Sequence, residues 1–402
     1  MLIQRDILPK LEKWIAHKEI IALVGLRQVG KTTLLKEIQK KCKNSIFISL
    51  EDVSILNLFE NSIDEFIKIY ILPFDYIFID EVQYSKNSGQ RLKFIYDKFE
   101  NKKIFISGSS KSELAIHSLS RLVGRVIIFE ILPVSFSEFV RFKSKEKYRL
   151  LNQDKNSFVF DSLKVLFEEY LQFGGYPEII LEKDETIKKE KLKNIVNTYI
   201  LKELVEILGY RNSFEFENLI RRLAIQDGGI LNKSNLSNEL GINRNKIDEM
   251  INVLDKTGII QIIYPYLKNK TKQIVKSPKV YFRDIGFKNS LLNNFNKLNL
   301  RQDKGQIYEN FVLNALYKNN FSPEFFRIEE ENEVDFILEK DGKILGIECK
   351  SKLKSMKIPK ATKKFIDLYL PDKVLVLNEN IYGEMENILF SDYLEVLRED
   401  LL

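Results

Sequence analysis

The amino-acid sequence predicts an α/β fold whose N-terminal part is a doubly wound parallel sheet. Short apolar runs alternate with helical patterns, as expected of strands that are buried on both faces. The first run, residues 20–24, leads into a glycine-rich turn that opens a helical pattern. A later run, residues 76–79, ends in the acidic pair Asp80 and Glu81. The chain has 402 residues, enough for about two to four domains, so this sheet is expected to be one part of the molecule.

Composition and charge exclude several classes of protein. Hydrophobic residues make up 44% of the chain, which is ample for packed cores, but no apolar run reaches the roughly 18 residues that a membrane span requires. The N-terminus lacks the layout of a secretory signal, and we therefore expect a cytoplasmic protein. Cys42 and Cys349 are expected to be plain thiols. His17 and His117 are the only histidines, so acid–base chemistry would fall on carboxylates or metal-bound water.

The segment 25–33 has the sequence and the context of a phosphate-binding P-loop. Its glycines let backbone N–H groups close around phosphate oxygens, and the Thr32 hydroxyl can hold Mg²⁺. Lys31 supplies positive charge to the β and γ phosphates, which gives it a catalytic role as well. The residues expected to bind ATP here are Gly25, Gln28, Gly30, Lys31, Thr32 and Thr33.

Two further strands are predicted, at residues 45–49 and 76–79. The second of these would be a buried parallel strand that delivers Asp80 to the Mg²⁺ ion beside Thr32. Glu81 would then polarise the attacking water as the catalytic carboxylate. The alternative is that both acids lie on the surface after an ordinary strand.

A fourth strand is predicted at residues 103–107, and it ends in small polar side chains. Ser107 could contact the γ-phosphate or its water if this strand lies between the two nucleotide-binding strands. Arg121 and Arg125 precede a fifth strand at residues 126–129. Either arginine could serve as an arginine finger, within the chain or across a subunit boundary, and a structural salt bridge carries equal weight.

Taken together, these motifs resemble a prokaryotic family of AAA-type ATPases. The resemblance is carried by residues 25–33, 79–83, 107–110, 124–125 and 130–139, and by the segment 173–177, which is similar to a signature in the family's helical lid. Family members pair this core with a C-terminal domain resembling PD-(D/E)XK nucleases, and most are of undetermined function. The resemblance implies an ATPase core at residues 1–139 and a helical lid at residues 140–210.

Residues 211–292 are predicted to form a winged helix-turn-helix. Residues 232–240 and 244–256 read as two amphipathic helices joined by a tight turn at Gly241, which is the spacing of that motif. A basic segment, 261–290, holds seven lysines and arginines against one acid, and strand candidates within it suggest a wing that would hold DNA phosphates. Base edges would be read by Asn243, Arg244, Asn245 and Lys246. The alternative is a protein-interaction or spacer module.

Residues 293–402 are predicted to form an α/β restriction-endonuclease-like domain. Asp335 begins one strand and Glu348-Cys-Lys350 ends the next, so a hairpin would bring two carboxylates and a lysine to one point. Asp335 and Glu348 would hold Mg²⁺, and Lys350 would orient or deprotonate the water. Glu309, on a preceding helix, resembles the additional acid that many PD-(D/E)XK enzymes place near the metal. A second basic cluster follows at residues 350–364.

The sequence therefore predicts a protein that binds and hydrolyses ATP and acts on DNA, with ATP and Mg²⁺ as cofactors. In one interpretation the C-terminal domain is a Mg²⁺-dependent nuclease. In the other, the protein is a nucleotide-controlled switch or DNA-binding protein whose C-terminal domain does not cleave. The oligomeric state stays open, with a homo-oligomer as one outcome.

Overall fold

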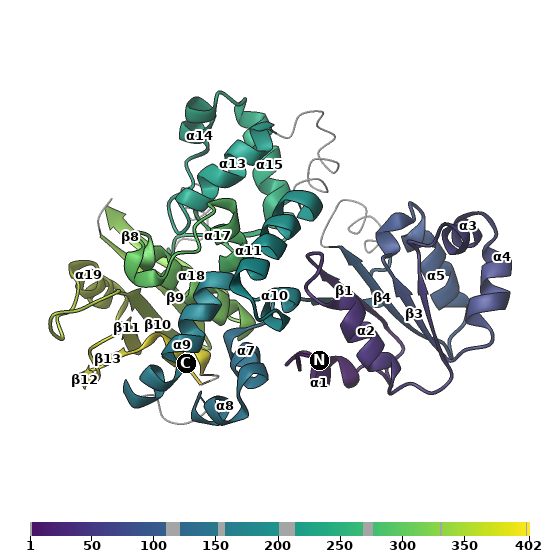
Figure 1. Ribbon diagram of the computed structural model, residues 1–402, viewed down its shortest axis with the longest axis horizontal. Helices are drawn as coiled ribbons and strands as arrows, with labels where there is room; N and C mark the ends of the chain where they lie inside the picture. Colours follow the sequence, from purple (N-terminus) through teal and green to yellow (C-terminus); the bar gives the residue numbers. More distant parts are fainter. Residues whose placement is uncertain are drawn as a thin grey trace. The chain divides into compact units, whose positions relative to one another are not determined.

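The computed structural model describes residues 2–109, 121–151, 157–200, 214–267, 276–329, 332–398 and 400–402. The chain forms two compact units (Figure 1). The first consists of Met1–Val134 with Asn252–Ile259, and the second of Ser135–Ile251 with Ile260–Leu402. None of the helices in the described part of the chain has the length and hydrophobicity that a membrane span requires.

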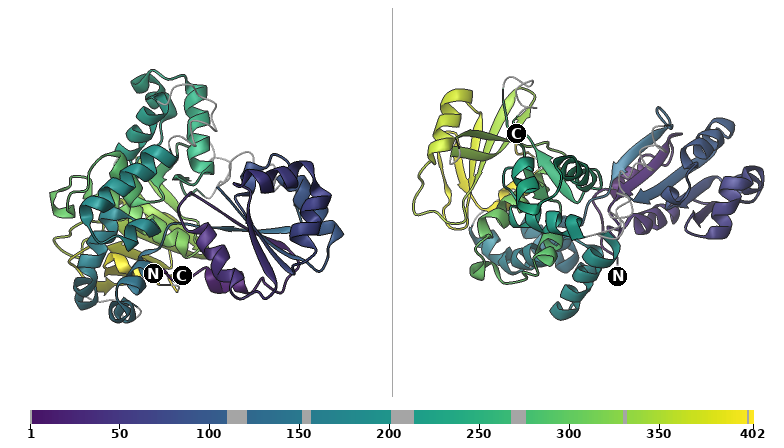
Figure 2. Two further views of the ribbon diagram at one scale, coloured as in Figure 1. Left: turned by 45° about the vertical axis from the view of Figure 1, so that its right-hand side comes forward. Right: turned by 90° about the horizontal axis from the view of Figure 1, so that it is seen from above.

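The first unit contains a five-stranded sheet in which every neighbouring pair of strands is parallel (Figure 2). Its strands are β1 (Ile20–Gly25), β2 (Ser45–Ser49), β3 (Tyr76–Asp80), β4 (Lys103–Ser109) and β5 (Val126–Glu130). Their order is β2-β3-β4-β1-β5, so β4 lies between β1 and β3 as predicted. Because the strands are parallel, all their carboxyl ends meet at one edge of the sheet. The predicted parallel central sheet is confirmed.

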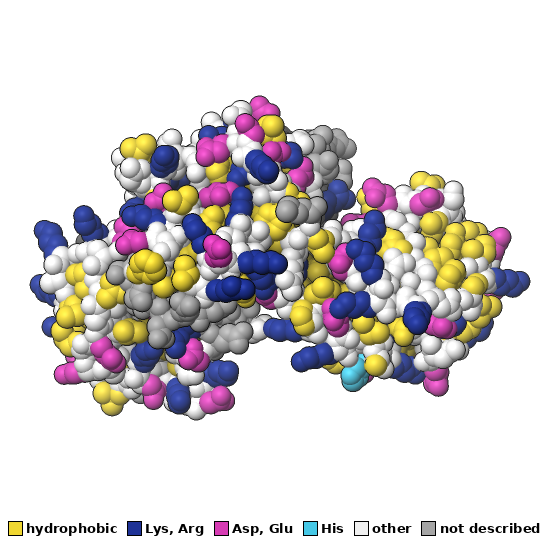
Figure 3. Space-filling model, turned by 60° about the horizontal axis from the view of Figure 1, so that its bottom comes forward, with side chains coloured by type: hydrophobic (Ala, Val, Ile, Leu, Met, Phe, Trp, Pro, Cys, Tyr) yellow, Lys and Arg dark blue, Asp and Glu magenta, His cyan; other side chains and the backbone are white. Residues whose placement is uncertain are grey.

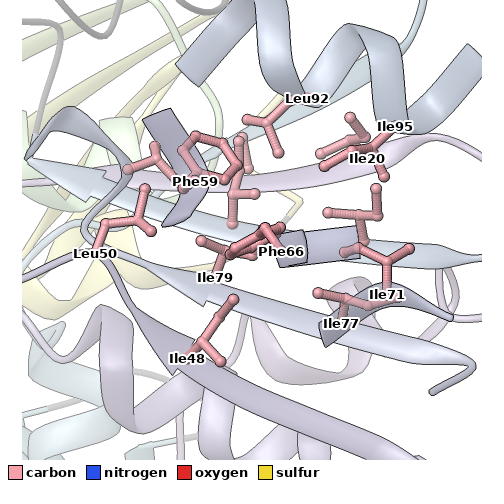
Figure 4. Close-up of a cluster of buried hydrophobic side chains, with 14 of the residues drawn as sticks. Ile20, Ile48, Leu50, Phe59, Phe66, Ile71, Ile77, Ile79, Leu92 and Ile95 are labelled. Carbon is pink, nitrogen blue, oxygen red and sulfur yellow. The ribbon is translucent and has the colours of Figure 1, made fainter. Parts of the chain in front are cut away.

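Apolar side chains cover both faces of this sheet. On one face, Ile77 and Ile79 of β3 lie in a buried cluster with Phe59 (Figure 4). On the other, Phe78 stacks on Phe105 of β4, with ring centroids 4.7 Å apart. The strands therefore read as continuous apolar runs rather than alternating ones. The helices of this unit are α1 (Leu8–Glu12), α2 (Lys31–Gln39), α3 (Val53–Asn61), α4 (Ile63–Phe66) with a π-helical turn (Ile67–Ile71), and α5 (Ser88–Lys98).

The second unit begins with helices that pack on its C-terminal part. They are α7 (Phe136–Lys143), α8 (Lys145–Leu151), α9 (Ser157–Phe173), α10 (Pro177–Leu181) and α11 (Glu185–Asn194), the last continued by a π-helical turn (Ile195–Ile200). Phe136 of α7 and Phe167 of α9 meet Phe311 of α18 (Lys304–Lys318) edge to face, with ring centroids 5.8 and 4.8 Å from that of Phe311. The helices of the predicted lid thus share a core with the C-terminal region, and closure over nucleotide stays a prediction.

A tight backbone crossing joins the end of α9 to the start of α17 (Ile285–Leu291). Asp284 caps α17 by accepting from Phe287 N at 2.8 Å, and it also accepts from Gly175 N at 2.7 Å. A Cβ atom on Gly286 would lie 2.1 Å from Phe173 O, and one on Gly174 would lie 2.3 Å from Asp284 Oδ1. Gly174, in the segment 173–177, and Gly286 are therefore required by this crossing.

The helices predicted for the helix-turn-helix form where expected. The elements are α13 (Phe214–Ile225), α14 (Lys233–Leu240), α15 (Arg244–Lys256), β6 (Ile260–Ile263) and β7 (Lys279–Phe282). Asn232 caps α14 by accepting from Asn235 N at 3.0 Å, and Gly241 ends it in the left-handed region with φ 65°. The predicted apolar face of α15 is buried. Residues 268–275 of the predicted wing lie outside the described residues.

A six-stranded mixed sheet forms the C-terminal part of the second unit, in the order β12-β13-β11-β10-β9-β8. The elements are β8 (Glu324–Glu329), β9 (Asn332–Lys340), β10 (Lys343–Cys349), α19 (Lys360–Tyr369), β11 (Lys373–Leu377), β12 (Gly383–Met385), β13 (Ile388–Ser391) and a 3₁₀ turn (Tyr393–Leu397). The predicted hairpin is β9–β10, whose turn residues Asp341 and Gly342 have φ values of 52° and 80°. The segment after β6 joins β8, since Tyr266 N donates to Phe325 O at 2.5 Å.

Candidate functional site

The predicted P-loop residues lie at the carboxyl edge of the first sheet. β1 ends at Gly25, and α2 begins at Lys31, so the connecting loop lies at the N-terminus of a helix. Gln28 and Gly30 take left-handed backbone angles, with φ 63° and 99°. A Cβ atom on Gly25 would lie 2.4 Å from the carbonyl oxygen of Ile131, so only glycine fits there. A loop of this kind aims N–H groups at one point and suits an anion.

The Lys31 side chain is buried against the loop that precedes it. Its Nζ atom donates to the carbonyl oxygens of Gly25 at 2.9 Å and Leu26 at 2.8 Å. Phosphate oxygens carry full negative charge and would attract the ammonium group more strongly than these neutral carbonyls. Lys31 is therefore held beside the place where the phosphates are expected.

Thr32, Asp80 and Ser107 converge from α2, β3 and β4. Thr32 Oγ1 donates to Asp80 Oδ2 at 2.7 Å, and Ser107 Oγ donates to Asp80 Oδ1. Asp80 is buried, so its carboxylate is fixed by both hydroxyl groups. Two adjacent oxygen ligands with open positions for water and phosphate oxygens suit Mg²⁺. The structure thus brings together the residues expected to hold this ion.

Glu81 follows Asp80 in a left-handed conformation, with φ 56°. Its backbone N–H donates to Ser107 Oγ at 3.3 Å, and its carboxylate accepts a hydrogen bond from Gln83 Nε2. Gln83 belongs to the motif that carries the family resemblance, but no role for it was predicted from the sequence. The contact shows that Gln83 holds the carboxylate predicted to act on water.

The two arginines considered as arginine fingers do not join this group of residues. Arg125 precedes β5 and forms a two-pronged ion pair with Asp97, at 2.7 and 3.2 Å. The carbonyl oxygen of Arg125 accepts a hydrogen bond from the N–H of Ile20 at the start of β1, so Arg125 lies at the amino edge of the sheet. At about 3.3 Å per strand residue, this edge is about 16 Å from Gly25 at the end of β1. Arg121 donates to Gln90 at 3.3 Å. A nucleotide contact from Arg125 would therefore require another molecule.

The predicted acidic residues of the C-terminal sheet also come together. Asp335 in β9 and Glu348 in β10 are buried on neighbouring strands, and Asp335 Oδ2 accepts from Cys349 N at 2.7 Å. Lys350 forms an ion pair with Glu348. Glu309, on α18, accepts a hydrogen bond from Tyr281 of β7 at 3.3 Å.

Electrostatics in this acidic group favour a cation. Burial raises the pKa values of Glu309, Asp335 and Glu348. The negative charge of Asp335 raises the pKa values of Glu309 and Glu348 further. Within the described residues, Glu348 Oε2 has no hydrogen-bond partner.

The spacing of the acids sets the kind of metal site that fits. In the described part of the chain, no three carboxylate, imidazole or thiol groups lie close enough together to enclose an ion. Mg²⁺ is commonly held by only one or two carboxylates, with water and phosphate oxygens completing its shell. Asp335 and Glu348 fit an ion of that kind.

Lys279 and Lys288 correct the expectation for the basic segment 261–290. Both belong to the basic segment that was expected to contact DNA phosphates, but each is buried. Lys279 pairs with Glu333 at 3.0 Å, and Lys288 lies 3.4 Å from Asp227 and 3.3 Å from Asp303. Neither is available to a phosphate, because both strand and helix turn these side chains inward.

The other predicted DNA-binding residues lie at the surface. Asn243, Arg244 and Asn245 are exposed at the start of α15, while Lys246 pairs with Glu215. The lysines that are exposed in the second basic cluster are Lys352, Lys354, Lys357, Lys360, Lys363 and Lys364. Figure 3 shows lysine and arginine side chains in small groups among acidic ones on the visible face.

Comparisons with known proteins agree with the N-terminal site. Residues 17–140 match a family described as an AAA domain. Residues 164–298 and 304–393 match two domains of unknown function, DUF8612 and DUF4143. An uncharacterised protein of Methanocaldococcus jannaschii, MJ1544, is 32% identical over 363 residues, which cover 87% of this chain and 77% of that protein. An uncharacterised protein of Haemophilus influenzae is 26% identical over 356 residues, with 82% of each chain covered.

Among solved structures, domain III of the replication initiation protein DnaA from Thermotoga maritima is similar, with a TM-score of 0.30 and 14% identity. The similarity covers 49% of this chain and 95% of that chain. It is too weak to bear on function.

Proposed function

The chain belongs to the family of uncharacterised prokaryotic proteins that includes MJ1544, with an AAA domain in its N-terminal part, and from this we propose that its first unit binds and hydrolyses ATP. The contact of Thr32 and Ser107 with the two oxygens of Asp80 is the observation that carries the proposal. It joins a P-loop helix to an acid-tipped strand at the carboxyl edge of a parallel sheet. That arrangement is suited to a triphosphate with its metal ion.

Each residue has a distinct part in the proposed reaction. The backbone N–H groups of the loop 26–30 bind the phosphates, and Lys31 neutralises the β and γ oxygens. Thr32 and Asp80 hold Mg²⁺, which supplies further charge neutralisation when bound. Glu81 orients the attacking water once its carboxylate leaves Gln83. Ser107 fixes the Asp80 carboxylate and the backbone of Glu81 through its hydroxyl group, which donates to Asp80 and accepts from Glu81 N.

Steady-state phosphate release by Glu81→Gln tests this proposal. The variant should retain ATP while losing turnover, because an amide orients water poorly and cannot take up its proton. Glu65→Gln, on an exposed position of α4, is the matched control and should behave as wild type. Equal turnover of Glu81→Gln and wild type would refute the assignment of Glu81. Absence of saturable ATP binding by folded wild-type protein would refute the proposal as a whole.

For the second unit, the best-supported function is Mg²⁺-dependent hydrolysis of DNA phosphodiesters. Asp335 and Glu348 would hold the ion, which would activate a water molecule when bound. Lys350, whose side chain is 42% exposed, would leave Glu348 for the water or a phosphate oxygen. Glu309 would stand beside them as a further acid. The buried Glu348 Oε2 atom, without a partner among the described residues, supports this assignment.

A non-cleaving role is the alternative, and the Lys350–Glu348 ion pair favours it, because the ammonium already neutralises charge that would otherwise hold the metal. The protein would then be a nucleotide-controlled switch or DNA-binding protein. Incubation of several DNA forms with Mg²⁺ or Mn²⁺ decides between the two. Cleavage that is lost in Asp335→Ala/Lys350→Ala supports the nuclease, and no cleavage of any DNA form supports the switch.

The proposed domains are an ATPase core at residues 1–139, a lid at 140–210, a winged helix at 211–292 and a nuclease-like domain at 293–402. The winged helix is the part proposed to bind DNA. The exposed residues Asn243, Arg244 and Asn245 at the start of α15 support it. Arg244→Ala should weaken DNA binding, and the affinity should fall steeply with added salt because counterions are released. Binding that does not change with salt would favour a protein-interaction module.

A further inference from the structure

Lys279 lies in the acidic site although the sequence places it far from the acids. Its side chain is 2% exposed, and its Nζ atom is 3.0 Å from Glu333 Oε1. It also lies 5.5 Å from the centre of the Phe325 ring. A buried ammonium group is costly unless negative charge surrounds it, so the acids and Lys279 stabilise each other.

The backbone fixes Lys279 in place. β7 pairs with β6, where Lys279 lies opposite Ile263, and a bridge on its other edge joins it to Ile230. Tyr281 is two residues further along the same strand, so its side chain leaves the same face. Its hydroxyl donates to Glu309 Oε2 at 3.3 Å. One face of β7 therefore presents both a cation and a hydrogen-bond donor to the acids.

The charges of this site can be counted. The carboxylates are those of Glu309, Glu333, Asp335 and Glu348, and the ammonium groups are those of Lys279 and Lys350. Four carboxylates and two ammonium groups leave a formal charge of −2, which a single divalent ion neutralises. Two divalent ions would leave a formal charge of +2 with Lys279 present but only +1 without it, so Lys279 disfavours the second ion.

The two lysines differ in their exposure to solvent. Lys350 is 42% exposed and follows the end of β10, whereas Lys279 is sealed inside the unit. Lys279 also interacts electrostatically with Glu309, Asp335 and Glu333, and these charges raise its pKa despite its burial. Its 3.0 Å ion pair with Glu333 makes it a resident cation on that side of the site.

We propose that Lys279 is a built-in cation of the acidic site that takes the place of a second divalent ion, so that the site binds one ion, held by Asp335 and Glu348. This inference rests on the proposed metal-dependent function of the second unit. It makes Lys279 a positioning residue, contributed by the strand β7 that precedes the nuclease-like region. The site is therefore incomplete without residues from the predicted winged helix.

The test counts Mn²⁺ ions bound to the full chain without nucleotide, by electron paramagnetic resonance. The number of ions at this site is the difference between each protein and the same protein carrying Asp335→Asn. This difference should be one ion for wild type and one for Lys279→Arg, which keeps the charge. It should be two ions for Lys279→Met, because a second ion binds at this site.

Each result has a separate meaning. If Lys279→Met is folded and binds one ion like wild type, the proposed role of Lys279 is wrong while the metal site stands. If wild type already binds two ions here, the same conclusion follows. If Asp335→Asn removes no ion from wild type, the proposed metal-dependent function itself fails.

Thermal unfolding provides a second readout in case Lys279→Met is poorly folded. Removal of the ammonium group leaves buried acids unpaired, so this variant should melt below wild type in the absence of metal. Added Mn²⁺ should raise its Tm more than that of wild type or Lys279→Arg. Lys279→Gln, which keeps a donor for Glu333, should show the same recovery. Equal Mn²⁺ shifts in all four proteins would overturn the proposal.

Discussion

Replacing Gly286 by alanine should unfold the second unit at a much lower denaturant concentration than wild type requires. The new Cβ atom would lie 2.1 Å from Phe173 O and 2.4 Å from Phe173 C, both of which are backbone atoms. Real Cβ contacts lie above 3.0 Å, so the ends of α9 and α17 would have to separate by about 1 Å. That movement would also stretch the bond from Gly175 N to Asp284 Oδ2, now 2.7 Å long.

The expected loss is about 2 to 6 kcal/mol in the free energy of unfolding. Overpacking in a core costs roughly 1–3 kcal/mol, and a buried N–H group left without its acceptor costs about 1–3 kcal/mol more. Gly305→Ala is the control, because it lies in α18 with open space around its Cβ position. That change should stabilise the protein by about 0.5–1 kcal/mol, since alanine loses less backbone freedom in a helix.

Urea unfolding followed by hydrogen exchange and mass spectrometry measures the effect within each unit. Peptides from α9 and α17 should lose protection in Gly286→Ala and keep it in Gly305→Ala. The fluorescence of Trp14, the only tryptophan, reports the first unit separately. The reasoning fails if Gly286→Ala and wild type share the same midpoint in the peptides of α9 and α17.

Three further predictions concern the ATP site and pH. Gly25→Ala should weaken ATP binding at least tenfold, because its Cβ would lie 2.4 Å from Ile131 O and force the P-loop to move. Titration with labelled ATP measures this, and an unchanged affinity would contradict the prediction. Gln83→Leu should raise ATP turnover by roughly tenfold, because it removes the hydrogen bond that holds the Glu81 carboxylate. A hydrogen bond to a charged group is worth about 1.5–3 kcal/mol. Slower phosphate release would show instead that Gln83 positions Glu81 for catalysis. Burial raises the pKa of Asp284 from 3.8 to about 6, so the folded state holds this proton more tightly than the unfolded chain does. The free energy of unfolding should therefore fall by about 3 kcal/mol in total as pH rises from below about 3 to above about 7, relative to Asp284→Asn. A difference that is constant with pH in urea titrations would refute this.

Local sequence patterns were sufficient for the elements and for each site taken alone. Apolar runs marked the strands, caps and glycines marked the ends of α14, and Asp341-Gly342 marked the β9–β10 hairpin. The P-loop spacing and the Asp80 strand end predicted that Thr32 and Asp80 lie at one Mg²⁺ site, and the two side chains are hydrogen-bonded to each other. These features depend on residues close in sequence, or on the common edge that parallel strands share.

Contacts between distant segments were decided only by tertiary packing. Lys279 belonged to a segment predicted to contact DNA phosphates, but it pairs with Glu333. Arg125 was predicted to lie near the nucleotide, but it pairs with Asp97. The helices at 140–194 were predicted to form a lid, and their sequence did not reveal that Phe167 packs on Phe311 of α18. A charge on a strand or helix does not reveal which buried acid it will meet, because that depends on how apolar faces far apart in the chain come together. The sequence alone therefore determined the nucleotide-binding motif and the order of elements, while the tertiary structure decided which charges are enclosed and which remain free.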